Sequence, residues 1–112
     1  MGDLNDDPAD SSVLKVLGAK GAVAGLQDGE LFNPMWQLLN DGTGSLQYRG
    51  VWNLFDQIII SEPLLNAKKG WKFKKAGVYN EKFLVEQEGK FAGYPFRTFA
   101  GKKYLGGFSD HF

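Results

Sequence analysis

The chain contains no cysteine, a single histidine and no excess of charge of either sign. Without cysteine it can form neither a disulfide framework nor a thiolate metal site. Thirteen basic and thirteen acidic residues balance, so no overall field attracts nucleic acid or an anionic membrane. The sequence also lacks a signal-peptide pattern and an apolar run long enough to span a bilayer. These absences leave the compartment undefined.

The residues that are present suit one modest folded domain. Hydrophobic residues make up 43% of the 112 residues and aromatic residues 14%, which is enough apolar material for a single small core. Fifteen glycines indicate many turns. No internal repeat or low-complexity tract is present.

Helix signals are short and lie in the first two thirds of the chain. Residues 12–17 are expected to form a helix that ends at Gly18. Residues 34–39 form a second, with Asn33 as its cap and a proline in the first turn. A third short helix is expected over residues 62–68, after a cap at Ser61.

Strand signals surround these helices. Residues 45–49 and 51–61 predict two strands joined near Gly50. Residues 71–78 alternate apolar and basic side chains, which favours an exposed strand. The mixture predicts an α+β fold.

The pattern becomes irregular after residue 80. Aromatic residues and glycines fill residues 91–108 and lead directly to Asp110 and His111. Two interpretations remain open. The aromatic rings line a substrate-facing wall, or they pack as a core for a segment with few helices.

The two ends of the chain carry the most suggestive polar residues. If Gly2-Asp3-Leu4-Asn5 is the end of a strand, Asp3 and Asn5 share one face and Leu4 points into a core, because strand side chains alternate. At the other end, His111 is the only imidazole and follows an acid. Ordinary turn formation at the first end, and a solvated terminus at the last, are the competing interpretations.

A carboxylate in the middle of the chain connects the two ends. Asp56 lies in the apolar run of residues 52–61, where an unpartnered charge is costly. A hydrogen bond to one ring nitrogen of His111 would fix the histidine tautomer and give Asp56 a partner. The competing interpretation is an edge-strand charge that prevents aggregation.

Three short motifs, taken in order, resemble the endonuclease/exonuclease/phosphatase superfamily. Gly2-Asp3-Leu4-Asn5 is similar to its G-D-[FL]-N motif, Phe55-Asp56-Gln57-Ile58 to its acid-bearing strand, and Ser109-Asp110-His111 to its terminal S-D-H. The superfamily includes apurinic endonucleases, pancreatic-type DNases, neutral sphingomyelinases and inositol-polyphosphate phosphatases.

The resemblance implies a four-layer α/β/β/α sandwich, of which residues 1–112 would form the C-terminal half. That half is expected to hold one mixed, mostly antiparallel sheet with helices on one face. Met1 directly before Gly2 is interpreted as an added start, so the chain is expected to be an excised piece that lacks the N-terminal half and its metal-binding glutamate.

The implied activity is metal-dependent hydrolysis of a phosphoester, as a phosphodiesterase, nuclease or phosphatase, with Mg²⁺ or Mn²⁺. Asp3, Asn5, Asp56 and His111 are the implied catalytic residues. Asp3 and Asp110 are the implied metal ligands. Because one half of the site is absent, the piece alone is expected to be inactive.

Two further expectations concern partners. The alternative function is a non-catalytic binding module that uses residues 91–108 to hold a sugar, a lipid headgroup or a protein. Loss of one half would bare an apolar sheet face around residues 51–60, which favours a homodimer. The lysines of residues 68–75 are interpreted as a solvated face, with steering of phosphate as the alternative.

Overall fold

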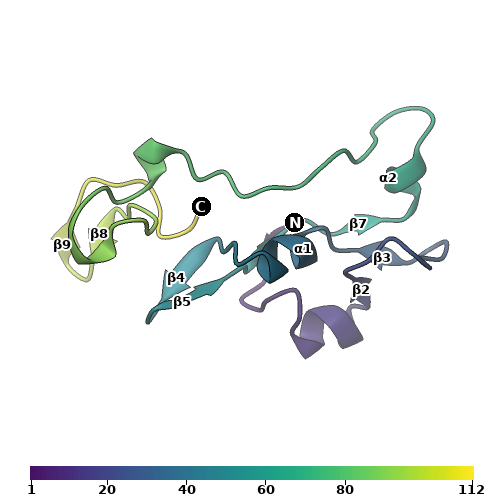
Figure 1. Ribbon diagram of the computed structural model, residues 1–112, viewed down its shortest axis with the longest axis horizontal. Coiled ribbons are helices and arrows are strands. Elements are labelled where there is room, and N and C mark those ends of the chain that lie inside the picture. Colours follow the sequence, from purple (N-terminus) through teal and green to yellow (C-terminus); the bar gives the residue numbers. More distant parts are fainter.

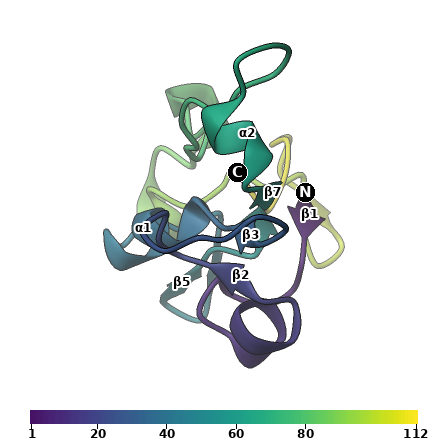
Figure 2. The same ribbon diagram turned by 90° about the vertical axis from the view of Figure 1, so that its right-hand side faces the viewer.

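The computed structural model describes all residues, 1–112, and is elongated. Its principal extents are 49 × 30 × 23 Å and its radius of gyration is 16.1 Å, whereas ~13 Å is typical of a compact domain of this length. Figure 1 shows the strands β2, β3 and β7 at one end, β8 and β9 at the other, and both termini near the middle. Figure 2 also places the two termini close together.

The chain folds into short strands and short helices, and about a fifth of the residues belong to each class. This confirms the α+β prediction. The strands are β1 (Gly2–Asp3), β2 (Ala19–Lys20), β3 (Leu31–Phe32), β4 (Leu46–Tyr48), β5 (Val51–Asn53), β6 (Asp56–Gln57), β7 (Ile60–Ser61), β8 (Phe99–Ala100) and β9 (Lys103–Tyr104). The helices are the π-helix η1 (Ser12–Val16), α1 (Met35–Asn40), α2 (Pro63–Asn66) and the 3₁₀ turns η2 (Lys82–Leu84) and η3 (Gly89–Phe91).

The strands form four small sheets, so the expectation of one mixed sheet is wrong. β1 pairs with β6, β3 lies between β2 and β7, β4 pairs with β5, and β8 pairs with β9. Every pairing is antiparallel except β2 with β3. The four-layer arrangement stays a prediction.

The predicted strand over residues 51–61 is broken into β5, β6 and β7, which belong to three different sheets. The first break lies at Leu54, whose side chain is completely buried. Its backbone N–H donates to the Asp7 carboxylate (2.5 Å) and not to a neighbouring strand. The ladder therefore stops there, because an N–H group that donates to a side chain is lost to the sheet.

The helix predictions are largely confirmed. η1 ends before Gly18, which has a φ of +73°, and α1 begins after Asn33, whose side-chain oxygen accepts the Met35 N–H (3.1 Å). α2 lies within the predicted range, but its cap position is Glu62, without a side-chain hydrogen bond, so the predicted cap at Ser61 is wrong.

Residues 71–78 form no strand, and that prediction is wrong. In Figure 1 the chain between α2 and the next helical turn runs past the body without pairing. The alternation of apolar and basic residues has another cause, because the lysines face water and Phe73 packs edge-on against Phe32, with ring centroids 6.1 Å apart. Extended backbone without a partner edge is not a strand.

The core is small and lies in the first sixty residues. It consists of Val13, Ala19, Phe32, Met35, Leu54 and Ile60. The accessible surface is 7840 Å², against about 6,100 Å² for a compact monomer of this mass. Much apolar surface therefore faces water. No helix is long and apolar enough to cross a membrane.

The aromatic side chains of residues 91–108 are mostly exposed, so their interpretation as core is wrong for the rings at 91, 99, 104 and 108. Phe99 and Tyr104 face each other across the β8–β9 pair, with ring centroids 5.3 Å apart. Gly107 lies so close to Phe96 that an added Cβ would clash with the Phe96 carbonyl oxygen. This close approach fixes the loop just before the Asp-His pair.

Candidate functional site

The N-terminal segment lies against the strand that carries Asp56. β1 and β6 are antiparallel with Asp3 opposite Asp56 and Gly2 opposite Gln57. The pairing continues through the Leu4 N–H, which donates to the Phe55 carbonyl (2.8 Å). The Cα atoms of directly opposite residues on a ladder stand about 5 Å apart, and the side chains of such a pair project from the same face, so the two carboxylates share one face of this small sheet.

Asn5 follows immediately in a left-handed turn. Its φ is +55°, a conformation that asparagine tolerates better than most residues. Its backbone N–H donates to Asp3 Oδ1 (2.9 Å), so one oxygen of the Asp3 carboxylate holds the turn. The Asn5 side chain itself is exposed beside Asp3.

The C-terminal segment returns to the same place. Leu46 and His111 form an isolated antiparallel bridge, the Phe112 N–H donates to the Ser45 carbonyl (2.7 Å), and the Phe112 ring stacks on Trp52 at a centroid distance of 6.1 Å. These contacts fix His111 next to the beginning of β4.

His111 and Asp56 form a close pair. Nδ1 of the ring lies 2.8 Å from Asp56 Oδ2, and the exposed fractions of the two side chains are 25% and 33%. An ionised carboxylate can only accept, so Nδ1 carries the proton and Nε2 is the nitrogen left for a ligand. This is the tautomer that a carboxylate partner selects in histidine sites.

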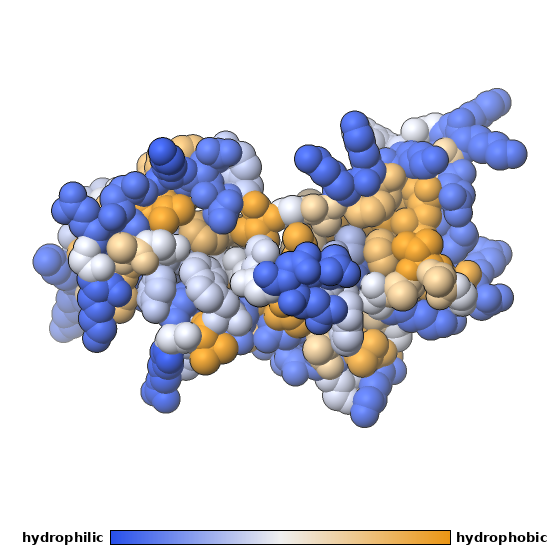
Figure 3. All heavy atoms as spheres, viewed as in Figure 1, coloured by the Kyte–Doolittle hydropathy of each residue, from blue (hydrophilic) through white to orange (hydrophobic).

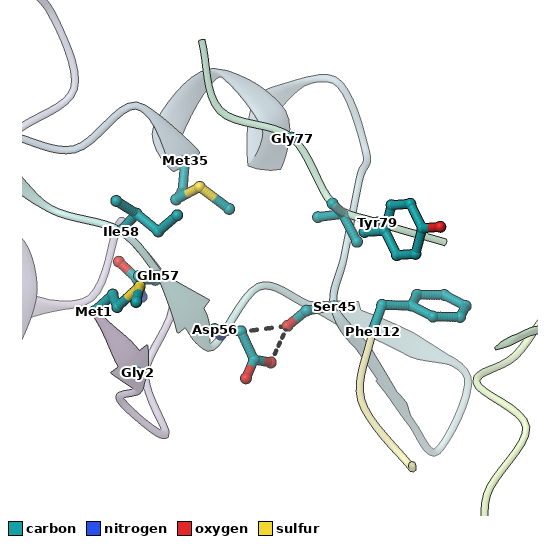
Figure 4. A pocket seen from close by; sticks show the side chains of 11 residues that line it. Met1, Gly2, Met35, Ser45, Asp56, Gln57, Ile58, Gly77, Tyr79 and Phe112 are labelled. Carbon is teal, nitrogen blue, oxygen red and sulfur yellow. Dashed lines mark hydrogen bonds between the residues drawn. The ribbon is translucent and has the colours of Figure 1, made fainter. Parts of the chain in front are cut away.

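Ser45 completes this pair and was not among the residues that the sequence suggested. Its side chain is fully buried, and its hydroxyl donates to the same Asp56 oxygen, Oδ2, over 2.5 Å. The Asp56 N–H donates back to the Ser45 hydroxyl (3.3 Å). Figure 4 shows these two hydrogen bonds. A serine at the start of a strand carries no sequence signal for such a role.

A cavity of about 320 Å³ opens beside Asp56. Asp56 and Ser45 line it together with apolar side chains, among them Met35, Tyr79 and Phe112 (Figure 4). A polar pair at one side of a mostly apolar hollow is the usual composition of a small-molecule site. Tyr79 comes from the unpaired segment after α2, which therefore forms part of the wall.

Buried polar groups hold the N-terminal segment against this cavity. Gln57 donates to the Asp6 carbonyl (2.6 Å) and accepts from the Asn33 amide (2.6 Å). Asp7 accepts the Leu54 N–H. Burial raises the pKa of Asp7 from 3.8, an effect that the Leu54 hydrogen bond opposes.

Asp110 is adjacent to His111 in sequence but exposed, and its carboxylate forms no hydrogen bond or ion pair. No group of three or more histidine, aspartate or glutamate side chains lies close enough to hold a metal ion. The structure thus brings Asp3, Asp56 and His111 together with Asn5 beside them. It does not join Asp110 to them as a metal site.

A comparison with protein families gives a match over the whole chain, residues 1–112, to the Endonuclease/Exonuclease/phosphatase family. The chain belongs to this family. No curated protein and no solved structure matches significantly. Family membership indicates a hydrolase and agrees with the convergence of the chain's two ends.

Proposed function

We propose that Asp3, Asn5, Asp56 and His111 bind and activate a phosphoester in a hydrolase of this family. The observation that carries the proposal is the convergence of residues from three separate segments. Asp3 faces Asp56 across β1 and β6, and Asp56 holds His111 at 2.8 Å. Acid and imidazole groups in one place suit phosphate chemistry, because charge must be stabilised and a water molecule oriented.

The proposed roles are those that the family resemblance implies, and two hydrogen bonds support them. His111, with Nδ1–H donated to Asp56, directs its remaining nitrogen, when protonated, to a phosphate oxygen as a charge-assisted donor. Asp3 has one oxygen engaged with Asn5 N–H, and its other oxygen orients and deprotonates the attacking water. The exposed Asn5 amide donates to the non-bridging oxygens.

Members of the family generally depend on a divalent metal, and the family motifs in the sequence predict Mg²⁺ or Mn²⁺ bound by Asp3 and Asp110. The donor set of this chain does not fit a complete site, since no three suitable side chains converge. Mg²⁺ prefers an octahedron of oxygens and gives up its waters reluctantly. A tightly held ion would therefore need ligands from outside these 112 residues.

We further propose that a second polypeptide surface covers this chain, either a complementary N-terminal half or a second copy. The support is the surface, since Val51 and Ile58 are exposed and the radius of gyration exceeds that of a compact domain. Only part of the apolar surface of residues 51–60 is exposed to solvent, because Leu54 and Ile60 are buried. Light scattering that finds a monomer at high concentration would exclude the homodimer.

The test uses the unique imidazole as a reporter. Dimethyl phosphate, an unreactive phosphodiester, is titrated into the protein while the ring signals of His111 are followed by NMR. The proposal expects saturable shifts of these signals in the wild type and much weaker binding in Asp56→Asn, which takes the charged partner from His111, whereas Asp3→Asn removes a negative charge from the water-orienting residue and keeps or strengthens the binding of the anion. Asp28→Asn, at an exposed aspartate whose side chain forms no hydrogen bond or ion pair, is the control. Shifts that do not saturate would contradict the proposal.

A second candidate function, a binding module, is favoured by a separate cavity of about 240 Å³ between the β4–β5 turn and the aromatic loop. Its lining includes two arginines, one carboxylate and three aromatic rings (Arg49, Arg97, Glu86, Tyr48, Phe91 and Tyr94). The arginines and the rings suit a sugar phosphate or a lipid headgroup. Binding of such a ligand that is lost in Arg97→Ala and kept in His111→Ala would favour the module.

A further inference from the structure

The loop after α2 concentrates the positive charge of the molecule. Five lysines and no acid lie within residues 68–75, which therefore carry a net charge of +5. Because the whole chain has a net charge of 0, the remaining residues carry −5. The balanced total conceals a strongly polarised chain, and an anionic surface would attract this end and repel the rest. We call residues 67–76 the basic loop.

The basic loop is attached to the body at its base. The Phe73 N–H donates to the Leu64 carbonyl (2.8 Å), and the Phe73 ring packs edge-on against Phe32 of β3. Gly70, at a φ of +76°, turns the chain directly before Trp71. The chain between Leu64 and Phe73 thus forms a closed, projecting loop. In Figure 1 it extends beyond α2 at one end of the long axis.

Within this projection, two residues before the anchor Phe73, the Trp71 side chain is 90% exposed, the highest value of any large hydrophobic residue after Met1. Its indole takes part in no aromatic pair, whereas Trp52 packs against two rings. None of the five lysines forms an ion pair, since the structure contains only Lys20–Glu30 and His111–Asp56. Figure 3 shows hydrophilic side chains projecting from this end above an apolar area.

We propose that the basic loop docks the protein on an anionic phospholipid bilayer. Clusters of four to eight basic residues bind the negative surface of such membranes, and tryptophan is the residue most suited to the interface between headgroups and acyl chains. A single bare indole surrounded by ammonium groups matches both requirements. Insertion of Trp71 would bring the lysines to the level of the headgroup phosphates.

Nucleic acid is the rival partner, and the arrangement suits it less. Single-stranded nucleic acid is bound in a charged groove with several aromatic platforms in series, while the basic loop is a projecting tip with one free ring. Its cations are all lysines, without the arginine forks that recognise phosphates and bases bidentately. A compact patch of point charges fits a flat, diffuse anionic surface.

The test measures co-sedimentation of the chain with vesicles of phosphatidylcholine alone or of phosphatidylcholine mixed with phosphatidylserine. One variant replaces the lysines of the loop by glutamine (Lys68, Lys69, Lys72, Lys74 and Lys75). The matched control replaces five exposed lysines elsewhere (Lys15, Lys82, Lys90, Lys102 and Lys103), so both variants have the same net charge. Trp71→Ala removes the ring alone, and circular dichroism verifies that each variant is folded.

The proposal expects binding only to vesicles with phosphatidylserine and a loss of at least about a hundredfold in the loop variant. The control variant keeps most of the binding. Trp71→Ala weakens it about tenfold or more and abolishes a blue shift of tryptophan emission on binding. Equal loss in both charge variants would overturn the proposal, and so would tighter binding of a single-stranded oligonucleotide than of the vesicles through the same lysines. Because no turnover is measured, failure here leaves the proposed hydrolase untouched.

Discussion

Ser45 and Asp56 hold each other through two hydrogen bonds at a single hydroxyl. The Ser45 oxygen donates to the Asp56 carboxylate and accepts the Asp56 N–H. The backbone of Ser45 also donates to Asn53 and accepts from Phe112. One buried serine therefore connects the β4–β5 hairpin, the central acid and the C-terminal segment that carries His111.

Ser45→Ala is expected to lower the free energy of unfolding by about 1–3 kcal/mol, the usual cost of leaving a part-buried polar group without its partner. Urea unfolding measures this. Ser61→Ala, at an exposed serine whose hydroxyl forms no hydrogen bond, is the control and should change stability by less than about 0.5 kcal/mol. Equal effects of the two substitutions would mean that the Ser45 hydroxyl holds nothing in place.

Asp7 is expected to make the free energy of unfolding fall as the pH rises, which is the opposite of the usual effect of an aspartate. Burial raises its pKa in the folded state from 3.8, with repulsion from Asp10 and Asp6 adding to the effect. The folded state therefore binds the proton more tightly than the unfolded state. The stabilising contribution is complete below pH 3.8 and is lost as the pH rises through the folded pKa.

Asp7→Asn should remove this part of the pH dependence, because the amide oxygen still accepts the Leu54 N–H without a charge. Asp7→Ala should cost about 1–3 kcal/mol at every pH, since that N–H is left unpaired. Hydrogen bonds from Lys20 lower the pKa of Glu30 in the folded state. Glu30 therefore contributes a stability that rises with pH, and this contribution is the same in the wild type and in both Asp7 variants. Chemical unfolding across the acid range measures the difference, and a slope unchanged in Asp7→Asn would refute the assignment.

The sequence predicted the parts of the molecule that depend on neighbouring residues. Asn33 before Pro34 marked the start of α1, and Gly18 the end of η1. The motif around Asp56 also pointed to a partner for the acid, and His111 lies there. Such features are set by local backbone chemistry or by a family motif, and both are visible in a sequence.

Long-range contacts account for what the sequence did not predict. The carboxylate of Asp7, far away in the chain, takes the Leu54 N–H and breaks the strand that periodicity favoured. Ser45 gains its role only when the hairpin and the C-terminus meet. Residues 71–78 alternate because they form a loop whose lysines face water while Phe73 anchors it to Phe32. An exposed strand would show the same alternation in the sequence.

The chain on its own is expected to hydrolyse no simple phosphodiester with Mg²⁺ or Mn²⁺, because its carboxylates do not converge on a complete metal site. Release of nitrophenol from bis(4-nitrophenyl) phosphate measures turnover, and calorimetry should find only weak binding of either ion. Turnover that disappears in His111→Ala would show that these residues suffice for catalysis.

The pairing of His111 with Asp56 is the contact on which the proposed site depends most, and the ¹⁵N chemical shifts of the single imidazole test it directly. At neutral pH the neutral ring is expected as the Nδ1–H tautomer in the wild type, since Nδ1 donates to Asp56. In Asp56→Asn this preference should be lost, while Asp110→Asn should leave it unchanged. A ring in the Nε2–H tautomer, indifferent to substitution of Asp56, would contradict the account.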